Sequence, residues 1–280
     1  MQMSRPGVLI AQISDLHIKP AGLRAYQQVD TAAALTRCIK ELNRFSPRPH
    51  FVVISGDLVD APSKEAYDHL LALLSPLEIP FAAVPGNHDD RDLMRAALPD
   101  GYARPSGALH SLRMIGDVDV VLVDSTNPGR NYGTLDAESL AWLEGVLAAS
   151  PSRPALVFMH HPPFVTGISH MDVQNLRNAD DLADTLHRHR RARLVAAGHV
   201  HRAALTNFAG AAATICPAPN HAVALDLDAR WPPSFTIEPP AFHLHAWIPD
   251  DGLGTVVTHW VPIGDFAGPY RFFDDHGEFL

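Results

Sequence analysis

The feature that most constrains this fold is a series of short apolar runs that alternate with helical patterns up to about residue 200. Each run is four to six residues long, which is the length of a buried strand rather than of a helix. The runs lie at residues 8–13, 51–54, 81–84, 118–123, 155–159 and 194–197. This alternation predicts an α/β fold in which helices cross over from strand to strand.

Apolar residues between these runs recur three or four positions apart, as they do on the buried face of a helix. The pattern predicts helices around Leu35, Cys38, Ile39 and Leu42, around Leu70, Leu73 and Leu74, and around Leu140, Leu143 and Leu147. The last of these helices has an expected N-cap at Asp136.

The chain changes character after residue 200, where frequent prolines exclude long helices and favour short strands. Alternation over residues 242–248 predicts a strand with one face buried, and Phe242, Leu244, Ala246 and Ile248 form that face. Residues 268–280 are rich in aromatic side chains, so we expect them to dock on the same chain or on a neighbouring one.

The formal net charge of −9 argues against a long nucleic acid as a partner, because such binding needs clustered Lys and Arg. The chain has one arginine cluster, and we expect it to be the solvated end of a helix. Its members are Arg188, Arg190, Arg191 and Arg193.

The two cysteines, Cys38 and Cys216, lie far apart and in no CxxC pattern, so both are expected to be buried apolar residues. No segment approaches the ~20 apolar residues of a membrane helix, and the N-terminal residues lack the pattern of a secretory signal. We therefore expect a cytoplasmic protein without a membrane partner.

Five short segments concentrate side chains that bind metals, and each follows directly after one of the apolar runs. They are 15–17 (Asp-Leu-His), 56–57 (Gly-Asp), 86–89 (Gly-Asn-His-Asp), 160–162 (His-His-Pro) and 198–201 (Gly-His-Val-His). Because the carboxyl ends of strands in an α/β sheet border one crevice, the segments are expected to meet there. Singly, each is at least as typical of a turn or a surface loop, but the five together predict a metal site.

In order and content these segments resemble the motifs D-x-H, GD, GNH[DE], H-x-P and GH-x-H of the calcineurin-like metallophosphoesterase superfamily, over roughly residues 8–205. Within it, GNHDD, FMHHPP and GHVHR are most similar to class III cyclic nucleotide phosphodiesterases and the related glycerophosphodiesterases. The resemblance implies a four-layer αββα sandwich with a β-rich, proline-rich C-terminal extension. Residues 1–215 would form the catalytic core, and residues 216–280 would complete the sandwich and contribute to a homo-dimer or an assembly of dimers.

The resemblance also implies a centre of two metal ions. One ion would be held by Asp15, His17, Asp57 and His201, and the other by Asp57, Asn87, His160 and His199. Asp57 would bridge the two ions. A set of nitrogen and oxygen donors without thiolate suits Fe, Mn, Zn or Co, and the sequence does not choose among them.

The implied activity is hydrolysis of phosphodiester bonds in small molecules, namely cyclic nucleotides, glycerophosphodiesters or both, by in-line attack of metal-bound hydroxide. The alternatives are a phosphomonoesterase or nuclease on the same scaffold, and a binding scaffold without catalysis. The chain retains all seven expected metal ligands, which disfavours a binding scaffold without catalysis.

Four further residues are expected near the metals. His88 would donate a proton to the leaving group, assisted by the ligands Asn87 and Asp57, and Asp89 would orient its ring. His161 would contact a ligand or the substrate, or else pack in the core. His170 belongs to residues 163–177, which form either a lid over the metals or an ordinary connecting loop.

Overall fold

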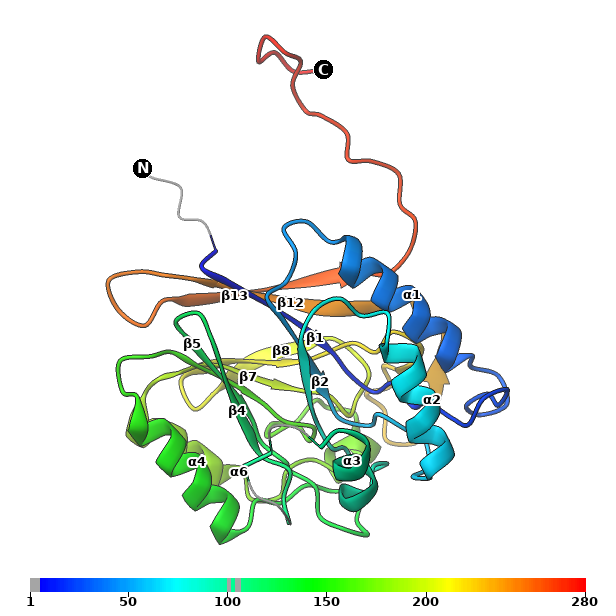
Figure 1. Ribbon diagram of the computed structural model, residues 1–280, viewed down its shortest axis with the longest axis vertical. Helices are drawn as coiled ribbons and strands as arrows, with labels where there is room; N and C mark the ends of the chain where they lie inside the picture. The colour runs from blue at the N-terminus through cyan, green and yellow to red at the C-terminus, as the bar shows by residue number, and fades with distance from the viewer. Residues whose placement is uncertain (1–5, 100–101, 104–106) are drawn as a thin grey trace.

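Two β-sheets packed face to face form the centre of the molecule, and helices cover the outer face of each sheet (Figure 1). The structure, a computed structural model, describes residues 6–99, 102–103 and 107–280. The strands of sheet 1, in spatial order, are β13 (Thr255–Pro262), β12 (Ala241–Ile248), β1 (Val8–Ile13), β2 (Phe51–Ser55) and β3 (Phe81–Val84). Those of sheet 2 are β4 (Ser111–Ile115), β5 (Val118–Leu122), β6 (Ala155–Phe158), β7 (Ala192–Ala197), β9 (Ala211–Ile215) and β8 (Ala204–Phe208).

Three buried apolar clusters define four layers. The first lies between sheet 1 and its helices, α1 (Thr31–Arg44), α2 (Lys64–Leu74) and α3 (Arg91–Ala97). The second lies between sheet 2 and its helices, α4 (Ala137–Ala149), α5 (Ser169–Asp172) and α6 (Ala179–His189). The third joins the facing sides of the two sheets. The fold is therefore the expected αββα sandwich.

The strands that end at the site are parallel within each sheet: β1, β2 and β3 in one, and β6 and β7 in the other. The carboxyl ends of parallel strands share an edge, so the five motifs converge there. All six expected apolar runs are strands, and Asp136 is the N-cap of α4, with its Oδ1 2.7 Å from the amide nitrogen of Ser139.

The chain after residue 200 is β-rich, as expected. It contributes β8 and β9 to sheet 2, β12 and β13 to sheet 1, and a separate two-stranded ribbon of β10 (Ala222–Val223) and β11 (Phe235–Thr236). β12 lies between β1 and β13, and sheet 2 covers its inner side. The expectation that only one face of this strand is buried was wrong. Both faces are buried, because His243, His245 and Trp247 pack toward sheet 2. A division of the chain at residue 215 stays a prediction.

The expectation of a solvated arginine cluster was wrong for Arg191. Its side chain is fully buried and forms an ion pair with Asp119, and its guanidinium also donates to the carbonyl oxygens of Val146 and Arg153. Burial is tolerated because these acceptors replace water around the charge. Arg188, by contrast, is on the surface of α6 and pairs with Glu144.

Cys38 and Cys216 are buried free thiols, as expected. No helix in the described ranges is long and apolar enough to span a membrane. Residues 268–280 extend away from the two sheets (Figure 1), and Tyr270, Phe272 and Phe279 are exposed, so the tail does not dock on its own chain.

Candidate metal centre

The residues that follow β1, β2 and β7 have unusual backbone geometry. Asp15, His17, Asp57, His199 and His201 all have positive φ, between 47° and 72°. Non-glycine residues rarely adopt this left-handed conformation, which costs free energy unless the surrounding structure imposes it. Five such residues at one edge of the sandwich indicate a site whose geometry is maintained at the expense of stability.

Two glycines allow the loops to approach one another closely. A Cβ atom on Gly86 would lie 2.1 Å from Oδ1 of Asp57, and one on Gly56 would lie 2.3 Å from Nδ1 of His160. Gly56 also has a φ of 98°. A side chain at either position would displace the carboxylate or the imidazole.

The first group of donors comprises Asp15, His17, Asp57 and His201, all of them buried. Nε2 of His17 lies 3.1 Å from Nε2 of His201 and 3.5 Å from Oδ2 of Asp57. Nε2 of His201 lies 3.4 Å from Oδ1 of Asp15. These are the four residues expected to hold one ion.

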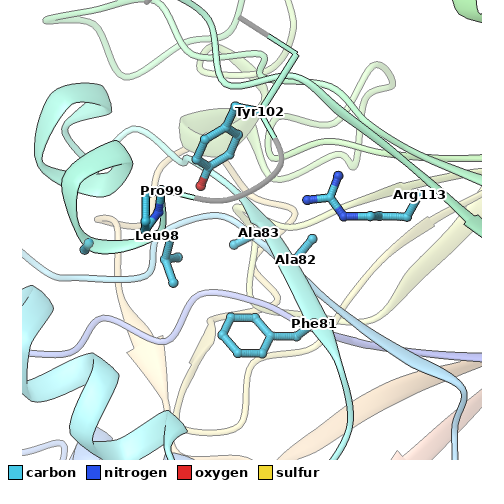
Figure 2. A pocket seen from close by; sticks show the side chains of 8 residues that line it. Phe81, Ala82, Ala83, Leu98, Pro99, Tyr102 and Arg113 are labelled. Atoms are coloured by element: carbon cyan, nitrogen blue, oxygen red, sulfur yellow. The ribbon is translucent and has the colours of Figure 1, made fainter. Parts of the chain in front are cut away.

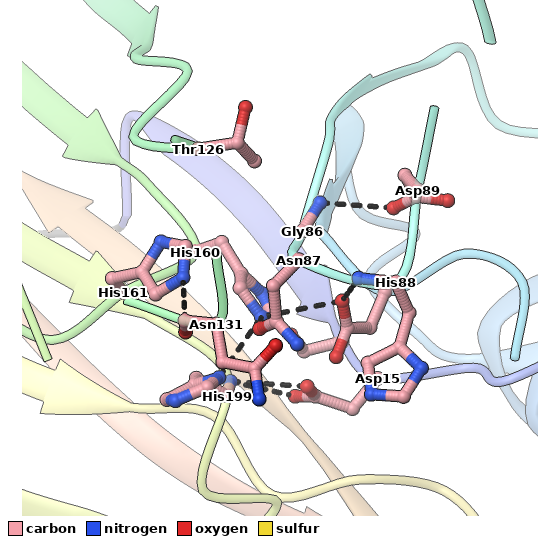
Figure 3. A network of polar contacts seen from close by, with 12 residues as sticks. Asp15, Gly86, Asn87, His88, Asp89, Thr126, Asn131, His160, His161 and His199 are labelled. Carbon is pink, nitrogen blue, oxygen red and sulfur yellow. Dashed lines mark hydrogen bonds and ion pairs between the residues drawn. The ribbon is translucent and has the colours of Figure 1, made fainter. Parts of the chain in front are cut away.

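The second group surrounds His160 (Figure 3). Nε2 of His160 lies 3.2 Å from Oδ1 of Asn87, 3.2 Å from Nδ1 of His199 and 3.4 Å from Oδ1 of Asp57. The two oxygens of Asp57 thus face different groups, which is the arrangement expected of a bridging carboxylate.

The distances and donor types fit metal ions. Two donors about 2.1 Å from one ion and at about 90–110° to each other lie about 3.0–3.4 Å apart, close to the separations in both groups. Burial lowers the pKa of His199 to about 3, so its ring is neutral and one of its two nitrogens has a lone pair for a metal ion. Burial also raises the pKa of Asp15 to about 6, a cost that a nearby cation would offset.

Several donors are oriented by hydrogen bonds away from the ion positions. Nδ1 of His160 donates to the carbonyl oxygen of Ser55 at 2.9 Å, which leaves Nε2 for the site. The backbone N–H of His199 donates to both carboxylate oxygens of Asp15, at 3.0 and 3.1 Å. Such contacts fix the donors before any ion binds.

His88 lies beside the first group, with its ring centroid 4.7 Å from that of His17. Its backbone N–H donates to Oδ1 of Asp57 at 2.9 Å, and its Nδ1 lies 2.7 Å from the carbonyl oxygen of Asp60. The expectation that Asp89 orients this ring was wrong. The carboxylate of Asp89 instead accepts hydrogen bonds from three backbone amides, of Leu58, Val59 and Gly86, and from the hydroxyl of Tyr67.

His161 is fully buried beside the second group, with its ring centroid 4.9 Å from that of His160 and 5.0 Å from that of His199. Nδ1 of His161 lies 2.9 Å from Oγ of Ser125, and Nε2 lies 3.2 Å from the carbonyl oxygen of Asn131. Both ring nitrogens are therefore engaged by the loop after β5, and the ring contacts expected donors as well as the core.

The sequence model of the calcineurin-like phosphoesterase family matches residues 8–203. The chain belongs to this family. It is 37% identical over 276 residues to the probable glycerophosphodiester phosphodiesterase of Arcobacter nitrofigilis, covering 98% of this chain and 100% of that protein. It is 33% identical over 233 residues to a probable cyclic nucleotide phosphodiesterase of Rhodopseudomonas palustris, covering 82% of this chain and 85% of that protein.

Among solved structures, a dimetal phosphatase from Danio rerio matches this phosphoesterase with a TM-score of 0.67. The match covers 93% of this chain and 100% of the other, at 16% sequence identity. At this identity the likeness supports the fold and nothing finer.

Five of the expected donors line a pocket of about 300 Å³, namely His17, Asp57, Asn87, His199 and His201, whereas Asp15 and His160 lie behind its lining. His170, on α5, reaches the pocket wall together with Met171 and Gln174, so part of the 163–177 segment borders the site. A separate cavity of about 220 Å³ lies near the end of α3 between Phe81, Tyr102 and Arg113 (Figure 2), and none of its lining residues belongs to the five motifs.

The residues of the pocket region that sequence reasoning missed include Tyr26, Asp60, Asn131, His221 and Phe235. Asp60 lies three positions after Asp57, and this proximity was a usable signal. No motif marks the other four, because tertiary contacts bring their segments to the site.

Proposed function

We propose that this protein is a dinuclear metal-dependent hydrolase of small phosphodiesters. One observation carries the proposal: the carboxylate of Asp57, on the wall of a single pocket, borders two groups of nitrogen and oxygen donors that are mostly buried. The names of the relatives, a glycerophosphodiester phosphodiesterase and a cyclic nucleotide phosphodiesterase, support the two substrate classes.

The proposed ligands of one ion are Asp15, His17, Asp57 and His201, and those of the other are Asp57, Asn87, His160 and His199. Bound there, the ions would polarise the phosphoryl group and acidify a water nucleophile. The donor set suits Fe, Mn, Zn or Co. His88 would supply a hydrogen bond or a proton to the departing alkoxide, because it lies next to the donors without being needed as one.

A substrate panel tests the activity. Metal-loaded protein should hydrolyse cyclic nucleotides, glycerophosphodiesters or both faster than the matched monoesters. Exhaustive chelation, verified by metal analysis, should abolish turnover. Faster hydrolysis of monoesters would favour the phosphomonoesterase alternative, and turnover by demonstrably metal-free protein would refute the proposal.

The proposal extends to a homo-dimer or an assembly of dimers, with a cytoplasmic location and without a long nucleic acid as a partner. The tail supports self-association, because Tyr270, Phe272 and Phe279 are each 77–80% exposed. Exposed aromatic side chains in this number are typical of an interaction surface. Sedimentation of the full chain at micromolar concentration should give a mass above 30.5 kDa, and a monomer alone would refute this part.

A further inference from the structure

We propose that Tyr26 and Phe235 form an aromatic platform for the phosphodiester substrate. The platform binds the planar part of an alcohol that is esterified to the phosphate, such as the nucleobase of a nucleoside. The inference rests on the proposed function and narrows its substrate class. The two ring centroids lie 5.0 Å apart at an interplanar angle of 30°, and both residues line the pocket that contains the metal donors.

His221 connects the platform to the donors. Its ring centroid lies 5.2 Å from that of Tyr26 and 5.3 Å from that of Phe235, in edge-to-face contacts. On the other side it lies 4.5 Å from the ring of His201. The platform thus begins one imidazole away from the proposed metal ligands, on the same pocket wall.

Tyr26 is held in place by a strained turn. Tyr26 and Gln27 have φ values of 48° and 60°, and the turn is closed by hydrogen bonds between Ala25 and Val29. Turns of this kind usually contain Asn or Gly, because other residues are disfavoured in the left-handed region. Despite this cost the sequence has a tyrosine, and this residue, which is 47% exposed, lines the pocket.

Phe235 is positioned by the ribbon of β10 and β11, in which it pairs with Val223. Nε of Arg202 donates to the carbonyl oxygen of Val223 at 2.9 Å, and Arg202 also pairs with Glu238 beyond β11. Arg202 directly follows the proposed ligand His201. Through Arg202 and Val223, the position of Phe235 is therefore linked to that of the proposed metal ligands.

The pocket lining also includes polar side chains from other segments of the chain, namely Asn131, His170 and Gln174. Such side chains suit the hydroxyl groups of a ribose or a glycerol. A glycerol diester would contact these polar side chains but leave the two rings uncovered, whereas a nucleoside ester would contact both the polar side chains and the rings. Stacking on an aromatic side chain tolerates any base, so the platform selects for planarity rather than for one nucleobase.

The test compares Phe235→Ala and Tyr26→Asn with the unaltered protein on three substrates: 3′,5′-cyclic AMP, bis(p-nitrophenyl) phosphate and glycerophosphoethanolamine. Asn suits the left-handed turn, so Tyr26→Asn removes the ring and keeps the backbone. Loss of base stacking should raise KM for cyclic AMP roughly 5- to 150-fold and leave KM for glycerophosphoethanolamine within about two-fold. Phe235→Tyr should retain the low KM.

Trp231→Ala is the matched control, because this aromatic residue lies between β10 and β11 but is 67% exposed and does not line the pocket. It should change no KM. The aryl substrate distinguishes a platform for nucleosides from one for any planar ester. An equal rise in KM for all three substrates, or no rise in KM in either variant, would overturn the platform.

Equilibrium binding separates the platform from the proposed function. Calorimetric titration of the metal-loaded protein with AMP should show weaker binding in Phe235→Ala and in Tyr26→Asn, whatever the turnover. If the unaltered protein hydrolyses no diester but still binds AMP through these two residues, the proposed function fails and the platform stands. If AMP binds the variants and the unaltered protein equally, the platform fails.

Discussion

The ring of His88 is fixed by the backbone of Asp60, whose carbonyl oxygen lies 2.7 Å from Nδ1. A carbonyl oxygen only accepts hydrogen bonds, so Nδ1 carries a hydrogen. The proton for the leaving group would therefore be a second one, carried on Nε2 of the imidazolium form of the ring. His88→Ala should therefore lower kcat about 10²- to 10⁴-fold for a diester with an alkoxide leaving group, as expected for a general acid. The loss should be smaller for nitrophenolate, which needs no proton to depart.

Metal analysis is the control for His88→Ala, which should keep both ions. If the variant loses metal, or slows good and poor leaving groups by the same factor, His88 has a structural or positioning role instead. The dependence on leaving group decides between these roles because a purely structural defect lowers both rates together.

The carboxylate of Asp89 stabilises the loops around the site rather than the ring of His88. Tyr67→Phe removes the hydroxyl that donates to Oδ1 of Asp89 at 2.9 Å and accepts from the backbone N–H of Asp90 at 3.3 Å. A hydrogen bond to a charged group contributes about 1.5–3 kcal/mol, so the free energy of unfolding should fall by about that amount. Urea denaturation measures the change. The leaving-group dependence of kcat should be unaltered. A change in this dependence would mean that Asp89 does act on catalysis through His88.

Asp57 is the proposed ligand of both ions, because its two oxygens face different donor groups, whereas Asp15 is the proposed ligand of only one. Asp57→Ala should therefore lower the occupancy of both ions, and Asp15→Ala should lower the occupancy of mainly one. Metal content per folded protein, measured by elemental analysis after dialysis, compares the two variants directly. Full occupancy of both ions in Asp57→Ala would show that it does not bridge them.

The central strands could be predicted because burial on both faces leaves a continuous apolar run. The expected runs at 8–13 and 81–84 coincide with β1 and β3. β4 and β8 were not predicted, because they are the edge strands of sheet 2 and several of their side chains are exposed. Without burial on both faces, such strands have no apolar run to reveal them.

The meeting of the candidate donors at one edge could be predicted because each of them lies within a few residues of a strand end, so chain connectivity alone brings them there. Tyr26 and Phe235 could not, because a turn and a separate ribbon bring them there. Asn220 illustrates the difference, since its side-chain amide donates to the carbonyl oxygens of Asp15 and Leu16, more than 200 positions away. A contact of this kind has no local sequence pattern.

His243 provides a test of the packing between the sheets. Its ring is buried on β12, its Nδ1 has no hydrogen-bond partner within the described residues, and burial lowers its pKa to about 4. In the unfolded chain the pKa of a histidine is about 6.5. Between these values the unfolded state binds a proton that the folded state does not, so acidification destabilises the fold.

At about pH 8 both states are neutral and His243 contributes nothing to the pH dependence. On lowering the pH to about 5, this residue should reduce the free energy of unfolding by about 2 kcal/mol. The loss sets in as the pH falls through about 6.5 and accumulates below that value. His243→Leu, which cannot be protonated, should show a correspondingly weaker pH dependence. Denaturation of both proteins in chelator removes any contribution from metal release, and His245, retained in both, contributes to each curve. Parallel curves for the two proteins would mean that His243 titrates alike in the folded and unfolded states, and that water reaches this side of β12.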